Sequence, residues 1–168
     1  KNDVLFKYQS GFRTNHSTYF ALSFLSDKIL RGFDNGFLTG MILIDLQKAF
    51  DTIDHEILFQ KMTHIGFSME VIKWFKSYLS KRTFTVSIND KTPSYGDLKC
   101  GVPQGSILGP LLFHLYVNDM KQAFKGDLLL YADDSCILCQ HKDVSVIEKT
   151  LNEDFSSLCD WFVNHKLS

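Results

Sequence analysis

The sequence predicts an α+β domain in which helices back a small antiparallel sheet. Two stretches, residues 82–100 and 127–139, have the pattern of paired strands, and helical segments separate them. The chain of 168 residues suits one domain with a substantial core, and neither repeats nor low-complexity segments divide it. The expected order is helix, strand, two helices, hairpin, helix, hairpin, helix.

The first half of the chain supplies the first helix, a strand and two further helices. Residues 15–33 carry apolar side chains at helical spacing, namely Phe20, Leu22, Leu25, Ile29, Leu30 and Phe33. Asn15, Ser17 or Thr18 could cap this helix, and Asp34-Asn35-Gly36 ends it. The run "GMILIDL", residues 40–46, is typical of a buried strand. Helices at 55–66 and 68–80 follow, the first closed by Gly66 and the second capped by Ser68.

The second half supplies two hairpins and two helices. The first hairpin turns at residues 89–91, and a Gly/Pro loop at 101–105 leads to an apolar helix over 106–120. Gly109-Pro110 lies early in that helix, where proline is tolerated. After the second hairpin, Ser145 and Glu148 form a candidate capping box for the last helix. That helix aligns Ile147, Leu151, Phe155, Leu158 and Phe162.

Composition restricts the function classes. No run approaches the roughly 18 apolar residues of a membrane span, and the start of the chain lacks a signal-peptide pattern. We therefore expect a soluble intracellular protein, in the nucleus or cytoplasm, without a membrane partner. The net charge of −1 gives no overall signature of nucleic-acid binding. A polyanion site would have to be local, and three basic pairs are equally well explained as solvated helix faces: Lys28/Arg31, Lys73/Lys76 and Lys81/Arg82.

The four cysteines and six histidines do not form a recognisable metal motif. Cys136 and Cys139 have C-x-x-C spacing, but they lie in a predicted strand, where positions three apart face opposite sides. We therefore interpret the cysteines, Cys100 and Cys159 included, as core residues.

Three carboxylates are placed where apolar strands end. Asp45 closes the run "MILID", and Asp133 and Asp134 follow "LLLYA". An unpaired carboxylate at such a position is costly unless it binds a cation. If the two strands are central neighbours in one sheet, the three oxygen-donor groups meet at one edge and suit Mg²⁺. Adjacent Asp residues are also common in simple turns, so this hypothesis needs further support.

A set of blocks in order provides that support. The blocks are "QSGFRTNHST" (9–18), "LIDLQKAFDTIDH" (43–55), "WFKSYLSKR" (74–82), "GVPQGSILGPLLF" (101–113), "YADD" (131–134) and "WFVNHKLS" (161–168). Together they resemble the reverse transcriptase domain of non-LTR (LINE-type) retrotransposons over nearly the whole chain. The resemblance implies a right-hand polymerase with partial fingers at 1–38 and palm at 39–168. It also implies that the thumb lies outside this sequence.

The resemblance also implies roles for individual residues. Asp45, Asp133, Asp134 and the carbonyl of Leu46 would bind two Mg²⁺ ions, for which Mn²⁺ could substitute, and the three aspartates would be catalytic. Phe50 would exclude ribonucleotides sterically, and Arg13 would contact the triphosphate. The remaining substrate-binding residues would be Gln104, Gly105, Tyr131 and Ala132. The implied partners are an RNA template, a DNA primer and deoxynucleoside triphosphates.

Three alternatives stay open beside RNA-directed DNA polymerisation. A group II intron or bacterial reverse transcriptase is disfavoured by "SILGPLLF" and "AFDTIDH". A non-catalytic nucleic-acid-binding remnant would be favoured by loss of one of the three aspartates, and all are present. A structural metal-binding domain does not explain Arg13, Phe50 or Gln104.

Overall fold

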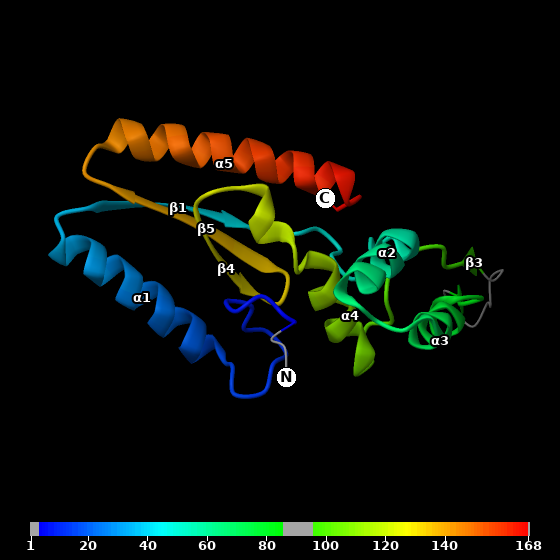
Figure 1. Cartoon of the computed structure of the whole chain (residues 1–168). Helices are drawn as coiled ribbons and strands as arrows, with labels where there is room; N and C mark the ends of the chain where they lie inside the picture. Colours follow the sequence, from blue (N-terminus) through cyan, green and yellow to red (C-terminus); the bar gives the residue numbers. More distant parts are fainter. Residues whose placement is uncertain (1–3, 86–95, 168) are drawn as a thin grey trace, which may run out of the picture. The chain divides into compact units, whose positions relative to one another are not determined.

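The computed structural model describes residues 4–85 and 96–167 (Figure 1). The chain separates into two compact units, one formed by Lys1–Ala49 with Val117–Ser168 and the other by Phe50–Tyr116. Each unit is defined by the contacts among its own residues, and the boundaries do not test the division into fingers and palm. The assignment of residues 1–38 to fingers and 39–168 to palm stays a prediction.

The first unit is built around a three-stranded antiparallel sheet. Its strands are β1 (Leu38–Ile44), β4 (Asp127–Tyr131) and β5 (Asp134–His141), in the order β1-β5-β4. Helices α1 (Thr18–Asp34) and α5 (Val144–Asn164) cover its two faces (Figure 1). The expected α+β class, with helices behind a small antiparallel sheet, is confirmed.

Strand β1 differs from its prediction. It is an edge strand among the described residues and not a buried central strand. Met41 and Leu43 point away from α5 and are 42% and 72% exposed. The opposite face of the strand is covered, because a Cβ on Gly40 would fall on Ile147 and Leu151 of α5. A continuous apolar run identifies a strand, but the number of covered faces depends on its partners.

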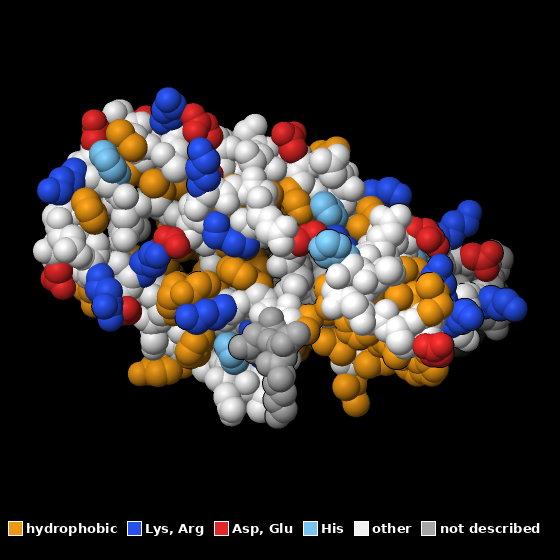
Figure 2. All heavy atoms as spheres, viewed as in Figure 1, with side chains coloured by type: hydrophobic (Ala, Val, Ile, Leu, Met, Phe, Trp, Pro, Cys, Tyr) orange, Lys and Arg blue, Asp and Glu red, His pale blue; other side chains and the backbone are white. Residues whose placement is uncertain are grey.

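Helix α1 begins and ends as predicted but is less buried than its sequence suggests. Ser17 caps it by accepting a hydrogen bond from the backbone N–H of Phe20, and Asn35 closes it. Buried residues of the helix are Ala21 and Gly32. Several side chains of the predicted apolar face are instead exposed: Phe20, Leu22, Leu30 and Phe33. Hydrophobic side chains accordingly remain visible at the surface on the α1 side of this unit (Figure 2).

Helix α5 starts from a cap that the sequence reasoning missed. Asp143, and not Ser145, is the N-cap, and its carboxylate accepts a hydrogen bond from the N–H of Ser145 at 2.9 Å. The predicted buried face is otherwise present, except that Phe155 is 39% exposed. Trp161 and Asp154 are buried instead. Asp154 accepts hydrogen bonds from the N–H groups of Lys125 and Gly126, and this fixes the approach to β4.

The second unit contains α2 (His55–Ile65), α3 (Met69–Leu79), the short pair β2 (Thr83–Phe84) and β3 (Gly96–Asp97), and α4 (Leu108–Val117). Gly66 ends α2 with φ 99°, and Ser68 caps α3, both as predicted. The predicted turn at 89–91 lies outside the described residues. The helix expected over 106–120 is shorter, because α4 ends at Val117 and a 3₁₀ turn, η1 (Met120–Ala123), follows. Among the described residues, none of the helices is both long and apolar enough to cross a bilayer.

Candidate active site

The hairpin β4–β5 has a two-residue turn that carries one of the predicted carboxylates. Tyr131 pairs with Asp134, which leaves Ala132 and Asp133 as the central turn residues. Ala132 has φ 55°, and a positive φ at the first central position is typical of a type II′ turn. The turn therefore places Asp133 at the tip and Asp134 at the first position of β5.

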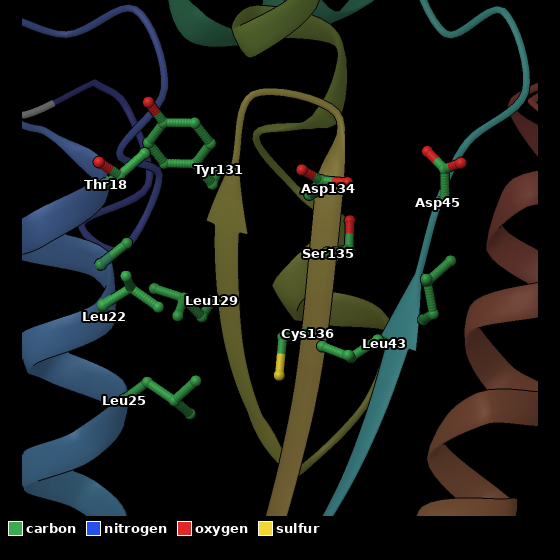
Figure 3. A pocket seen from close by; sticks show the side chains of 12 residues that line it. Thr18, Leu22, Leu25, Leu43, Asp45, Leu129, Tyr131, Asp134, Ser135 and Cys136 are labelled. Atoms are coloured by element: carbon green, nitrogen blue, oxygen red, sulfur yellow. The ribbon is translucent and has the colours of Figure 1, made fainter.

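The register of the sheet brings Asp45 to the same end. Ile44, the last residue of β1, pairs with Ser135, so Asp45 lies beside the start of β5. Asp45 and Asp134 both line a cavity of about 480 Å³ between α1 and the sheet (Figure 3). Most of the other residues that line this cavity are apolar, and they include Leu22, Leu25, Leu43, Leu129 and Cys136.

Electrostatic interactions link the three carboxylates. The pKa of Asp134 is raised, first by loss of hydration and then by the negative charges of Asp133 and Asp45. A divalent cation would relieve this repulsion, and a set of carboxylate oxygens is the donor chemistry that Mg²⁺ prefers. Within residues 4–85 and 96–167, however, there is no group of three or more Asp, Glu, His or Cys side chains arranged to hold a metal ion. The donor chemistry thus fits a hard cation, while the ligand geometry is not preformed.

Gln9 contacts the carboxylate-bearing turn, and the sequence reasoning did not single it out. Its side-chain amide donates to the carbonyl of Ala132 and accepts from the N–H of Ala132, each at 3.1 Å. Gln9 is 2% exposed. The residue lies in the first matched block, "QSGFR", but a polar residue in a loop has no periodicity that would reveal a partner so distant in sequence.

Arg13, predicted to contact a triphosphate, supports the same N-terminal segment. Its Nη1 donates to the carbonyls of Phe6 at 2.9 Å and Gln9 at 3.0 Å. These bonds give the guanidinium a structural role, and its contact with a triphosphate stays a prediction.

The remaining predicted substrate residues belong to the second unit. The Phe50 ring packs on Phe113 with centroids 5.0 Å apart, as a core residue would. Gln104 donates from Nε2 to Asp51 at 2.9 Å, and Gly105 has φ 75° with open space around its Cα. A cavity of about 290 Å³ in this unit is lined by polar groups that include His55, Arg82 and Gln104.

The basic pairs have different environments. Lys28 pairs with Asp127 and Arg31 with Asp27, so this pair contributes to ion pairs within the unit. On the second unit, the guanidinium of Arg82 lies 5.9 Å from the Tyr78 ring centroid, and Tyr78 stacks on Trp74. Lys73, Lys76 and Lys81 are exposed.

The interpretation of all four cysteines as core residues is only partly correct. Cys136 is buried, and burial raises the pKa of its thiol to about 11. Cys100 is exposed, and Cys139 and Cys159 are half-buried.

Comparison with known proteins gives the class of this domain. Residues 2–168 match the family described as reverse transcriptase (RNA-dependent DNA polymerase). The chain belongs to this family. It is 32% identical, over 94% of its length, to a probable RNA-directed DNA polymerase from transposon BS of Drosophila melanogaster. It is 31% identical, again over 94% of its length, to the RNA-directed DNA polymerase from the mobile element jockey of the same species. The relationship to non-LTR retrotransposon reverse transcriptases is therefore confirmed, although the chain spans only 18% of each relative.

The fold has a counterpart among solved structures. A telomerase from Candida tropicalis, in complex with a fragment of telomeric RNA, superposes with a TM-score of 0.57 over 80% of this chain and 27% of the telomerase chain. Sequence identity is 17%, so this similarity concerns the fold alone.

Proposed function

We propose that this chain is the palm, with part of the fingers, of a reverse transcriptase that extends a primer on an RNA template. The observation that carries the proposal is the meeting of Asp45, Asp133 and Asp134 at one end of the sheet, in a chain of the reverse transcriptase family. Its substrates are deoxynucleoside triphosphates, and the primer 3′-hydroxyl attacks the α-phosphate with release of diphosphate.

The aspartates and the Leu46 carbonyl would hold two Mg²⁺ ions. When bound, such ions lower the pKa of an attacking hydroxyl and neutralise the charge of the leaving diphosphate. Strand pairing brings the residues that would supply these ligands to the same end of the sheet. Pairing of Ile44 with Ser135 supports the placement of Asp45, and the two-residue turn supports that of Asp133 and Asp134. Tyr131 and Ala132 would support the primer end.

The remaining predicted residues would select and hold the nucleotide. Phe50 would lie against the sugar, Gln104 and Gly105 against the incoming nucleotide and template base, and Arg13 near the triphosphate. The open space around Gly105 supports a close approach of ligand to backbone. As for localisation, we propose that the protein acts inside the cell, where its RNA template and nucleotides are found.

The variant Asp133→Asn tests the proposal in the native-length protein. The carboxamide keeps the shape of the side chain and removes its charge, so primer extension should fall by roughly a thousandfold, the equivalent of about 4 kcal/mol. Primer–template affinity, measured by fluorescence anisotropy, should change little. Asp160→Asn, which removes an exposed carboxylate of α5, is the control for loss of one charge.

The same assay distinguishes the main alternative. A non-catalytic remnant would bind primer–template and extend nothing, with or without the substitution. Extension at the wild-type rate by Asp133→Asn would contradict the proposed role of Asp133.

A further inference from the structure

A single buried side chain satisfies both backbone polar groups of the residue that shapes the acidic turn. Gln9 Oε1 accepts from the N–H of Ala132, and Gln9 Nε2 donates to the carbonyl of Ala132, both at 3.1 Å. The same Oε1 accepts from the N–H of Gly11 at 3.1 Å. Because Gln9 is 2% exposed, water cannot readily replace these bonds.

The turn needs this support for a conformational reason. Ala132 has φ 55°, a region that residues with a Cβ rarely occupy and that glycine normally supplies. A two-residue turn built on Ala132 therefore relies on contacts from outside the hairpin to hold its shape. Among the described residues, the side-chain hydrogen bonds that reach Ala132 come from Gln9.

Gln9 is itself held firmly against the sheet. Backbone hydrogen bonds join Ser10 N–H to the Leu130 carbonyl at 2.9 Å and Leu130 N–H to the Tyr8 carbonyl at 3.0 Å. Residue 9 thereby forms a parallel bridge beside β4. In addition, Arg13 Nη1 donates to the Gln9 carbonyl at 3.0 Å. These bonds determine where the side-chain amide of Gln9 points.

The N-terminal segment also packs closely against the turn at Gly11. A Cβ added to Gly11 would fall on the backbone N and Cα of Ala132, so a larger residue there would displace the turn. Gly11 and Gln9 thus contact the same residue, Ala132: Gly11 packs closely against its backbone, and Gln9 forms hydrogen bonds with it.

We propose that Gln9 is a positioning residue for nucleotide addition: it fixes the turn Ala132-Asp133 from the N-terminal segment and so sets the position of the Asp133 carboxylate. The inference rests on the proposed polymerase function. Gln9 acts through the turn and not on the substrate. Its loss should lower the rate of the chemical step and leave binding of nucleotide and primer–template nearly unchanged.

The test compares two glutamines of the same unit in the native-length protein. Gln9→Met keeps the length and flexibility of the side chain and removes the hydrogen bonds. The matched control is Gln140→Met: Gln140 Nε2 donates to the Lys28 carbonyl at 3.0 Å and to Thr39 Oγ1 at 2.8 Å, at the other end of the sheet. Both variants lose side-chain hydrogen bonds within the first unit, but only Gln9→Met alters the acidic turn.

Rapid-quench kinetics on an RNA template with Mg²⁺ give the readout. We expect Gln9→Met to lower the maximal rate of single-nucleotide addition by about 10- to 100-fold, as for a displacement of about 1 Å at a reacting centre. The apparent affinity for the nucleotide should stay near the wild-type value. Gln140→Met should keep its rate within about threefold of the wild type, as for a change remote from the site. Gly11→Ala should lower the rate as Gln9→Met does, and the double variant should fall short of additivity because both act on one turn.

With an active wild type, the following outcomes would overturn the inference. If folded Gln9→Met matches Gln140→Met in rate, Gln9 is only structural. The same conclusion follows if Gln9→Met loses nucleotide affinity at an unchanged maximal rate, or if folded Gly11→Ala is fully active. If circular dichroism shows that Gln9→Met alone fails to fold, the residue is required for the fold and not specifically for the turn. Absence of extension by the wild type would instead contradict the proposed function, and the two failures are thereby distinguished.

Discussion

Asp45 and Asp134 interact although they are far apart in the sequence: the pKa of Asp134 is raised first by loss of hydration, then by the charge of Asp133, and then by the charge of Asp45. Asp45 follows β1, and Asp134 opens β5, so the antiparallel pairing of these strands places both carboxylates at one end of the sheet. Asp133, the larger of the two charge effects, acts from the neighbouring turn position. The structure thus concentrates negative charge at the point where the sequence predicts a cation.

The first prediction concerns the cost of that charge to stability. A raised pKa means that the folded protein binds a proton on Asp134 more tightly than the unfolded chain does. Binding of this proton stabilises the folded protein fully below the ordinary carboxyl pKa of about 4. The stabilisation is lost as the pH rises through the higher pKa that Asp134 has in the folded protein. Because Asp134 is exposed, the effect at neutral pH should not exceed about 1 kcal/mol.

Asp134→Asn should therefore raise the free energy of unfolding at pH 7 in the presence of a chelator, and the gain over wild type should shrink toward pH 4. Urea denaturation across this pH range measures it, with Asp160→Asn as the control for loss of a surface charge. A variant that is less stable than wild type at pH 7, or a pH-independent difference, would contradict the interpretation.

The second prediction concerns selection of the sugar. Phe50→Val should open space beside the nucleotide and increase ribonucleotide incorporation relative to deoxynucleotide incorporation, by about 10- to 200-fold in kcat/KM. Because the Phe50 ring packs on Phe113, the variant should also lose stability. Phe59→Val, which removes a buried ring from α2, controls for lost packing. Unchanged discrimination in a folded Phe50→Val protein would mean that Phe50 is a core residue.

The third prediction compares two glycines of the Gly/Pro loop. Gly101 and Gly105 have φ 83° and 75°, so alanine at either position should cost about 1 kcal/mol of stability for the left-handed conformation. At Gly101 an added Cβ would also lie 2.7 Å from the carbonyl oxygen of Asp51, whereas it would meet nothing at Gly105. Gly101→Ala should therefore cost about 1–3 kcal/mol more than Gly105→Ala. Equal losses in chemical denaturation would show that the loop relaxes around residue 101.

The fourth prediction concerns thiol reactivity. At pH 8 in the folded protein, an alkylating reagent should modify exposed Cys100 rapidly and leave Cys136 unmodified. Burial excludes the reagent, and a pKa of about 11 leaves little of the reactive thiolate at this pH. Peptide mass spectrometry measures both rates of modification. The control is the protein unfolded in urea, in which all four thiols should react. Fast labelling of Cys136 without urea would show that the core around it opens.

The sequence by itself determined the features that depend on neighbouring residues. The caps Ser17 and Ser68 and the terminator Gly66 follow from hydrogen bonds and dihedral angles within one helical turn. The two-strand pattern around "YADD" and the ordered family blocks can likewise be recognised from the local sequence. At the start of α5, however, Asp143 and Ser145 lie two residues apart and either could cap the helix. In the structure the N-cap is Asp143.

Only the tertiary structure decided which surfaces these elements cover. The apolar runs of α1 and β1 predict burial, yet Leu22 and Leu43 are exposed, because burial depends on how many partners each element finds. The approach of Asp45 to Asp134 required the register of β1 against β5. The hydrogen bonds from Gln9 to Ala132 required the N-terminal segment to lie beside β4. Such contacts join residues far apart in the chain, so local patterns identify the participants while long-range pairing sets their geometry.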